Sequence, residues 1–258
     1  MDTILDTLPR LLDGAWLTIQ ITVLSVVIGL VLAVPLAVLR LSPWAVVRWP
    51  VHAFIFFFRG TPLLVQLFLI YYGSGQFNGA LESVGLWTFF REAYFCGVLT
   101  LTLNTTAYTA EILRGALQTV PHGEVEAARA CGMRGLLLYR RILFPKAFRI
   151  AWPAYTNEVI FLLQATSLVS IITLMDITGV AQAAASRTFA FYEMYLTAAA
   201  MYLVLVYAVL FVFKRIEYRL TGHLRPVGVA PEPTAPEPEP AAPQAAATQG
   251  ASQDGRTP

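Results

Sequence analysis

The chain has 258 residues, of which 57% are hydrophobic and 13% are charged, and its formal net charge is +2. This composition is too apolar for an ordinary soluble domain, and the apolar residues come in long blocks that indicate membrane spans. Of the two cysteines, Cys96 lies in an apolar run and Cys131 in a charged segment. We expect them on different sides of the membrane, where they could not form a disulfide, and they have no CxxC spacing that would indicate a metal or redox motif.

The chain opens with an acidic stretch before the first predicted span. Residues 1–14 carry three aspartates against Arg10, whereas a secretory signal peptide begins with a positive stretch. Residues 15–39 carry no charge, and a run of that length suits one tilted span, with Pro35 as a candidate kink. We therefore expect residues 1–13 to form a short N-terminal segment outside the membrane.

The second predicted span, residues 49–72, contains features that bend a helix. It is apolar except for His52 and Arg59, and it includes Gly60 and Pro62, which together weaken a helix. An arginine inside a span is costly. Either it reaches back to the cytoplasmic end, or an interfacial helix precedes a span that begins just after the proline. We favour one bent span.

Three further spans complete the expected membrane domain. Residues 93–110 are uncharged but carry several threonines and Asn104, which at helical spacing are typical of hydrogen bonds between helices. Residues 150–175 form the fourth span, 177–191 a short amphipathic segment, and 194–213 the fifth. The predicted fold class is an all-α membrane protein with about five transmembrane helices.

The charged loop from Glu124 to Arg149 is the longest segment of the membrane domain that no bilayer could accept. Its pattern predicts a short helix, a break and a second helix. Pro121 suits the first turn, several alanines leave the first helix open to close approach, Gly132 permits a turn, and Pro145 ends the second helix. A solvated helical hairpin without a partner is the alternative interpretation.

The distribution of lysine and arginine predicts which side of the membrane each loop occupies. With the N-terminus outside, fourteen of these residues fall on the cytoplasmic side and three outside, leaving Arg59 uncounted. Cytoplasmic loops carry such an excess. We therefore expect the N-terminus outside and the C-terminus in the cytoplasm.

Residues 219–258 form a cytoplasmic tail that follows the membrane domain, residues 14–218. From Pro226 onward the tail holds eight of the sixteen prolines and no aromatic residue. Such a composition cannot bury enough apolar surface to fold, so the tail is predicted to be mostly disordered. A rigid polyproline spacer or docking element is the alternative.

Six positions of the charged loop coincide with a known family pattern. The loop resembles the EAA loop of importer permeases of the ATP-binding-cassette (ABC) class, with Phe144 in place of the usual leucine. The matching residues are Glu126, Ala127, Ala128, Gly132, Ile142 and Pro145. Further segments are similar to polar amino-acid permeases, especially the histidine, lysine/arginine/ornithine and opine branch: residues 58–63, 65–67, 103–112, 121–130, 153–160, 165–168 and 176–179. Together they cover most of residues 14–218.

The resemblance implies the type I ABC importer permease fold and a place in the bacterial inner membrane. The six loop residues would couple this chain to two cytoplasmic ATPase subunits. A second permease, similar or identical, and a periplasmic amino-acid-binding protein would complete the importer, surrounded by membrane lipid and without nucleic acid. The ATPases would use ATP and Mg²⁺, and this chain would bind no cofactor.

The sequence also indicates, independently of the resemblance, that any ATPase activity comes from another chain. A phosphate-binding loop needs glycines followed by a lysine and a serine or threonine, and neither Lys146 nor Lys214, the only lysines, stands in that context. Hydrolase motifs and metal-ligand spacings are also missing from the sequence. We therefore expect no catalytic and no metal-binding residues in this chain.

Glu158 is a charge that the sequence places inside the membrane. It lies nine residues beyond Arg149, roughly 13 Å further along a helix, at a depth where a carboxylate needs a partner. One interpretation is an ion pair, with Arg59 as a candidate partner, or a protonated carboxyl group. The other is a substrate path that favours a cationic amino acid. The candidate residues of this path are Asn157, Glu158, Gln164, Thr166 and Ser167.

The alternative function is an ion-coupled secondary transporter that acts without an ATPase, with Glu111, Glu158 and Asp176 as proton carriers. Such carriers are usually built from internal repeats, and none is evident in the sequence. We therefore expect the permease subunit of an ATP-driven importer for a polar, basic amino acid or opine.

Overall fold

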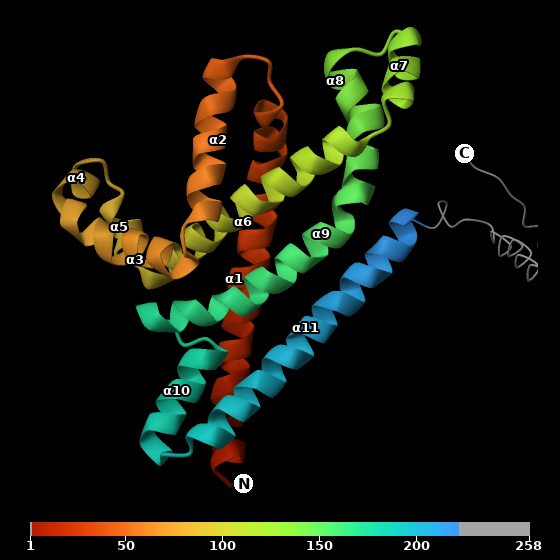
Figure 1. The fold of residues 1–258 in the computed structure, drawn as a ribbon. Helices are drawn as coiled ribbons and strands as arrows, with labels where there is room; N and C mark the ends of the chain where they lie inside the picture. The colour runs from red at the N-terminus through yellow and green to blue at the C-terminus, as the bar shows by residue number, and fades with distance from the viewer. Residues whose placement is uncertain (1, 222–258) are drawn as a thin grey trace, which may run out of the picture. The chain divides into compact units, whose positions relative to one another are not determined.

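A computed structural model describes residues 2–221, so the predicted disordered tail from residue 226 lies outside the described residues. Every described element is a helix (Figure 1), which confirms the prediction of an all-α protein for this part of the chain. The elements are α1 (Asp2–Arg40), α2 (Ala45–Gly60), α3 (Leu63–Ser74), η1 (Gly75–Phe77), α4 (Asn78–Ser83), α5 (Trp87–Phe90), α6 (Ala93–Thr119), α7 (His122–Ala130), α8 (Gly135–Leu138), η2 (Tyr139–Leu143), α9 (Phe144–Ala165), η3 (Thr166–Ile172), α10 (Ile177–Thr188) and α11 (Phe191–Thr221).

Within the described residues, three helical segments are long and apolar enough to cross a membrane: Leu5–Arg40, Gly135–Ile172 and Phe191–Arg219. A fourth span results if α2 and the segment after it are taken as one span, bent by 105° at the break between them. The helix α6 corresponds to the predicted third span. Its 27 residues are long enough to cross a membrane, but its threonines and asparagine make its mean hydropathy lower than that of the three segments above.

The N-terminal segment predicted to precede the first span is not a separate element. The helix α1 begins at Asp2 and runs without a break to Arg40, with Pro9 and Pro35 inside it. Residues 2–13 are therefore the first turns of the same helix that carries the apolar run. In Figure 1 this helix stands beside α10 at its N-terminal end and reaches α2 at the other.

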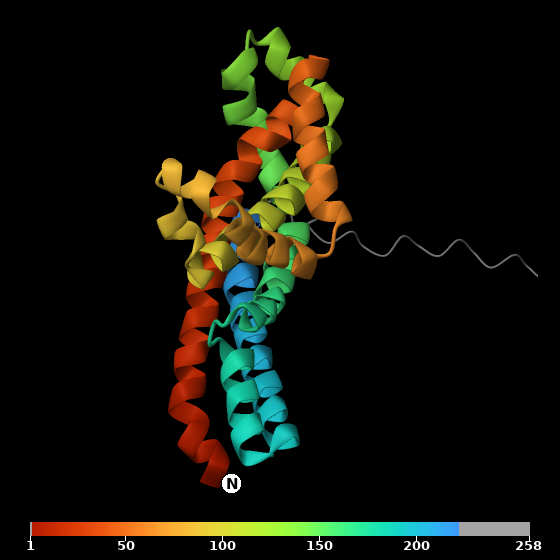
Figure 2. The same ribbon diagram turned by 90° about the vertical axis from the view of Figure 1, so that its left-hand side faces the viewer.

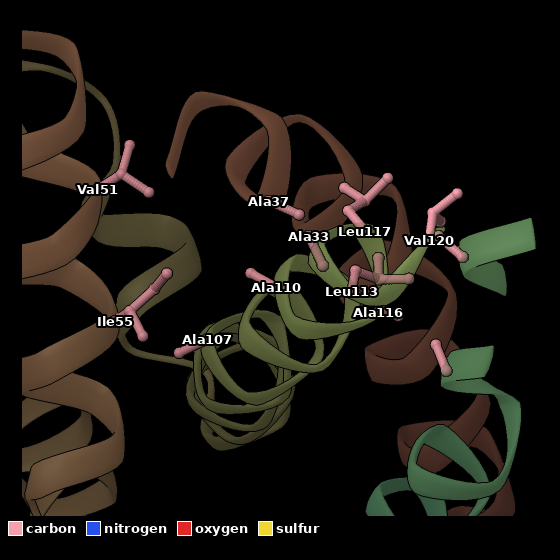
Figure 3. Packing of buried hydrophobic residues seen from close by; sticks show 12 residues of the cluster. Ala33, Ala37, Val51, Ile55, Ala107, Ala110, Leu113, Ala116, Leu117 and Val120 are labelled. Atoms are coloured by element: carbon pink, nitrogen blue, oxygen red, sulfur yellow. The ribbon is translucent and has the colours of Figure 1, made fainter. Parts of the chain in front are cut away.

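Small residues let α1 and α6 approach each other closely. A Cβ added at Gly29 of α1 would fall 2.5 Å from Cγ2 of Thr105 on α6. One to two turns further along α1, Ala33 and Ala37 are fully buried in a cluster with Ala107 and Ala110 of α6 (Figure 3). Small side chains are the usual means of bringing backbones together in a membrane.

The α6 threonines were expected to form hydrogen bonds between helices; Thr105 does so with Glu158 of α9, whereas Thr100 and Thr106 bond within their own helix. Thr100 donates to the Cys96 carbonyl at 2.7 Å, and Thr106 donates to the Thr102 carbonyl at 2.6 Å. Thr106 reaches the Gly29 carbonyl of α1 only at 3.5 Å. The reason is geometric, because a threonine hydroxyl in a helix lies close to the carbonyl four residues earlier.

The helices α10 and α11 run side by side (Figure 2), and the turn before α10 fixes them to α1. Asp176 is fully buried and caps the N-terminus of α10 by accepting a hydrogen bond from the Gly179 amide at 2.9 Å. Its other carboxylate oxygen accepts a hydrogen bond from the Tyr202 hydroxyl of α11 at 2.9 Å. Gly14 of α1 leaves no room for a side chain here, since an added Cβ would fall 2.9 Å from the Asp176 backbone.

Candidate functional site

The charged loop folds as a short helix and a turn, as its sequence predicts. Helix α7 begins directly after Pro121 and ends at Ala130. Gly132 then adopts a φ of +83°, a conformation that favours glycine. The Met133 amide donates to the Ala128 carbonyl at 3.0 Å and closes the turn. The glycine of the EAA pattern therefore has a definite backbone role.

Helix α7 attaches to the body by one face and leaves the other open. Ala128 is buried and Val125 packs against the cluster around α1 and α6. Glu124 forms an ion pair with Lys146 in the first turn of α9. Glu126 and Ala127 are exposed on the opposite side.

The apolar residues beside this face were not among the predicted site residues. Leu136 and Leu137 of α8 are 80% and 51% exposed, although α8 follows α7 directly in the loop (Figure 1). Large apolar side chains left open next to polar ones are typical of a protein-binding surface. The signal was present as a run of three leucines, residues 136–138, inside an otherwise charged segment. We call Glu126, Ala127, Leu136 and Leu137 the coupling surface.

Pro145 does not end the second helix, so that prediction is wrong. It occupies the first turn of α9, where its missing N–H costs nothing, and α9 continues to Ala165. The five residues Tyr139–Leu143 before it form a π-helical turn, in which the Phe144 amide reaches the Tyr139 carbonyl. The chain is therefore helical without interruption from Gly135 to Ala165. Ile142, another residue of the EAA pattern, lies half-buried in the π-helical turn.

A polar pocket of about 420 Å³ lies where three helical elements meet. The break between α2 and α3 contributes Thr61, α6 contributes Asn104 and Tyr108, and α9 contributes Glu158. Apolar residues complete the wall: Pro62, Leu63, Phe161, Leu162 and Ala165. Glu158 is the one charged residue among those that line it. An ammonium or guanidinium group is the chemical class that complements such a pocket.

The structure places only one of the five predicted substrate-path residues in this pocket. Glu158 lines it, whereas Asn157 and Gln164 are exposed elsewhere on α9. Thr166 is fully buried and donates to the Leu163 carbonyl at 2.7 Å, and Ser167 donates to the Gln164 carbonyl at 2.8 Å. The last two hydroxyls are thus satisfied by the turn that follows α9.

Two neighbours of Glu158 explain how a carboxyl group is held there. The Thr105 hydroxyl of α6 is its hydrogen-bond partner, and the Arg59 guanidinium is the positive charge that acts on it. Arg59 also lies over the ring of Tyr108, with its Cζ 5.1 Å from the ring centroid. Arg59 was predicted from the sequence as a candidate partner of Glu158. Tyr108 was not predicted, because its proximity to Arg59 depends on how α2 crosses α6.

The break that opens the pocket is held by two amides. Gln66 Nε2 donates to the Phe58 carbonyl at 2.8 Å and to the Thr61 carbonyl at 3.0 Å. Asn104 Nδ2 donates to the Phe58 carbonyl at 3.2 Å and to Gln66 Oε1 at 3.0 Å. These bonds satisfy carbonyls that the bend removes from the helical ladder. The predicted bend at Gly60 and Pro62 is thereby confirmed.

Several membrane helices, an exposed helical loop at one end and an internal polar pocket define a membrane permease. Residues 25–222 match the family described as binding-protein-dependent transport system inner membrane component, and the chain belongs to this family. It is therefore a multi-pass protein of the inner membrane. No group of three His, Cys, Asp or Glu residues that could hold a metal ion occurs within residues 2–221.

Several relatives share nearly the whole chain. The nopaline transport system permease protein NocM of Agrobacterium fabrum is 45% identical over 89% of this chain and 96% of its own length. The octopine permease protein OccM of Rhizobium meliloti is 47% identical over 88% and 94%. The histidine/lysine/arginine/ornithine permease protein HisM of Escherichia coli K12 is 43% identical over 83% and 90%.

Solved structures share the fold. An amino acid ABC transporter with histidines matches with a TM-score of 0.73 and 33% identity over 84% of this chain and 96% of its own. The MetNI methionine ABC transporter in an inward-facing conformation matches with a TM-score of 0.67 at 23% identity, over 82% of this chain and 96% of its own. The expected type I ABC importer permease fold is confirmed.

Proposed function

We propose that this chain is the permease subunit of an ATP-driven importer for a basic amino acid or an opine. The observation that carries the proposal is the continuous helix from Gly135 to Ala165, which joins the coupling surface to the polar pocket. One end of this helical run carries the exposed leucines of α8, and the other carries Glu158. A displacement imposed at the first end is therefore transmitted to the second.

The substrate class follows from the charge of the pocket and from the relatives. Three relatives are named for nopaline, octopine and the set histidine, lysine, arginine and ornithine. The amino acids of that set carry basic side chains. Glu158 offers one carboxylate in an otherwise neutral pocket wall, and a buried carboxylate favours a cationic ligand. The Tyr108 side chain and the Asn104 side-chain oxygen would fix its orientation, because the Thr61 hydroxyl already bonds to Phe57 and Gln66.

The partners are those that the family's architecture requires. Two cytoplasmic ATPases use ATP and Mg²⁺ and contact the coupling surface of this permease and of a second, similar or identical one. A binding protein delivers the amino acid from the opposite, periplasmic side, where the N-terminus lies. The lysine and arginine excess of the loop supports this orientation. Phe161, 68% exposed beside Asn157 and Gln164 on α9, supports a second permease packed on that face.

The mechanism is a change between two arrangements of the helices, biased by nucleotide. Closure of the ATPases moves α7 and α8, and the helix α9 carries this motion to Glu158 and the pocket wall. Nucleotide shifts the equilibrium only because the two arrangements place the coupling surface differently. The Glu124–Lys146 ion pair keeps α7 and α9 together during the movement.

The test is uptake of labelled arginine, histidine and octopine by the complex reconstituted with its ATPase and binding protein. The wild-type complex should accumulate at least one of these ligands when ATP is supplied. Glu158→Gln should assemble and hydrolyse ATP but take up several-fold less. Glu193→Gln, in the exposed first turn of α11, is the matched control and should behave as wild type.

Three outcomes would contradict the proposal in whole or in part. Uptake by the permease alone, driven by an ion gradient without the ATPase, would indicate a secondary transporter. Normal uptake by Glu158→Gln would remove the carboxylate from the substrate path, while loss of assembly would assign it to structure only.

A further inference from the structure

A second polar cavity lies next to the polar pocket. It has a volume of about 240 Å³, and we call it the cationic groove. It is lined by Arg40 at the end of α1, by one face of α2 and by Glu111 of α6. The α2 residues are His52, Ile55, Phe56, Arg59 and Gly60. His52 and Arg59 lie seven residues apart, so the groove follows α2 for roughly 10 Å.

Two buried polar atoms of the groove residues have no hydrogen-bond partner among the described residues. Arg40 bonds to His52 Nδ1 through Nη2 at 2.9 Å, but its Nε is buried and unpaired. Glu111 accepts from Arg114 Nε on Oε1 at 2.9 Å, but its Oε2 is buried and unpaired. One is a charged donor and the other a charged acceptor.

Buried polar atoms are nearly always satisfied, because an unpaired one costs the free energy of its lost hydration. The groove lining offers charges of both signs to a ligand: the guanidinium of Arg40 for an anionic group and the carboxylate of Glu111 for a cationic one. The head of an α-amino acid, with its carboxylate and ammonium groups, provides both within one small unit. Arg59 adds a second guanidinium to the groove lining.

The cationic groove and the polar pocket are successive cavities along the same pair of helices. On α6, Asn104 and Tyr108 line the pocket and Glu111, one turn further, lines the groove. Arg59 of α2 lines the groove, and Thr61, in the break just after α2, lines the pocket. The stacked pair of Arg59 and Tyr108 lies between the two cavities.

We propose that the cationic groove is a second amino-acid site, which receives the substrate head on the cytoplasmic side of the polar pocket and is separated from it by the Arg59–Tyr108 pair. The proposal rests on the proposed function, because it orders two sites along one transport path. Arg59 and Tyr108 act as the divider, whereas Arg40 and Glu111 bind the head group. Separation of α2 from α6 opens the divider and moves the substrate from one cavity to the next.

The first test counts the sites. Equilibrium binding of labelled L-arginine to the purified complex in nanodiscs should show two sites per permease chain. Glu111→Gln should abolish one, Arg40→Lys should weaken the same one at least tenfold, and Glu158→Gln should abolish the other. Arg48→Gln, an exposed cation at the start of α2, is the control and should retain both. A single site that Glu111→Gln leaves unchanged would overturn the proposal.

The second test addresses the divider. Ala165→Cys places a thiol in the polar pocket, in a chain whose exposed Cys131 is replaced by serine. A small cationic thiol reagent added to inside-out vesicles should label it several-fold faster in Tyr108→Leu than in the parent. Tyr108→Phe keeps the ring under Arg59 and should label as slowly as the parent. Equal rates in all three would show that the pair divides nothing.

A phosphatidylethanolamine head group carries the same two charges as an amino-acid head. Binding is therefore compared in nanodiscs with and without this lipid. Arginine binding that persists in both supports the substrate site, and displacement of arginine by the lipid would overturn it in favour of a lipid site. If the wild-type complex transports no ligand at all, the proposed function fails. If it transports normally and holds one arginine, only the second site fails.

Discussion

Asn104 on α6 donates a hydrogen bond to Gln66 on α3 at 3.0 Å, and through it α6 holds the break between α2 and α3. Gln66 is 2% exposed, and its own amide nitrogen satisfies the Phe58 and Thr61 carbonyls. The two amides thus connect three helices at the wall of the polar pocket. Their position makes the bend a fixed part of the fold.

Gln66→Leu should destabilise the protein, because it leaves two partly buried carbonyls with fewer donors at a cost of about 1–3 kcal/mol. Thermal unfolding of the purified permease in detergent measures the effect. Gln182→Leu, at an exposed position of α10, is the control and should change the midpoint little. A midpoint for Gln66→Leu equal to that of the control would show that the break is stable without this amide.

Gly132→Val should reduce transport while ATP hydrolysis continues, because valine is strained at a φ of +83° by about 1–2 kcal/mol and shifts the turn after α7. An added Cβ itself meets nothing within 4 Å, so the effect comes from the backbone alone. Gly132→Asn, which tolerates this conformation, should transport nearly normally. The coupling role is wrong if the valine variant shows normal uptake and normal stimulation of the ATPase.

The double substitution Leu136→Lys with Leu137→Lys should weaken assembly with the ATPase. Both side chains are open in the permease, so insertion and folding should survive, and a partner surface that covers them would lose apolar burial. Co-purification with the ATPase should fall at least tenfold. Leu86→Lys, on a half-exposed leucine before α5, is the control. Full retention of the ATPase by the double variant would place the contact elsewhere.

Asp176→Ala should destabilise the corner of α1, α10 and α11 by about 1–3 kcal/mol, since it removes the α10 cap and leaves the Tyr202 hydroxyl without its carboxylate acceptor, with Thr178 Oγ1 at 3.3 Å as a remaining partner. Asp176→Asn keeps an oxygen for the cap and should lose less. Unfolding midpoints in detergent give the ranking, and uptake by the asparagine variant gives the function. Abolished uptake in a stable Asp176→Asn protein would indicate a proton carrier instead of a cap.

The sequence predicts local features of this fold well, because each depends on residues close together in the chain. The turn at Gly132 could be predicted because glycine favours such a turn. The bend at Gly60 and Pro62 could be predicted from the known effect of these two residues on a helix. Pro145 was misread because a proline suits both the region after a helix and the first turn of one. The π-helical turn before Pro145 places this proline in the first turn of α9, and such a turn has no sequence signature.

The candidate site was predictable only in part, since it is made by crossings between helices. Glu158 could be predicted because it is a charged residue in an apolar run. Tyr108 could not be predicted, because its place in the pocket depends on the angle between α2 and α6. Asn104 was expected to bond between helices, and it does, but its partner Gln66 is 38 residues away. Thr166 and Ser167 looked like ligands by composition, and the turn after α9 uses their hydroxyls instead.

The contact at Gly29 limits which helices can move. A single added methyl group would already overlap Thr105 at 2.5 Å, so α1 and α6 are in close contact here, and we expect them to travel together. Interfaces packed this tightly transmit a displacement without absorbing it. We then expect relative motion during a transport cycle at the other seams of these two helices, among them those between α6 and α2 and between α6 and α9. Those are the two seams that border the polar pocket.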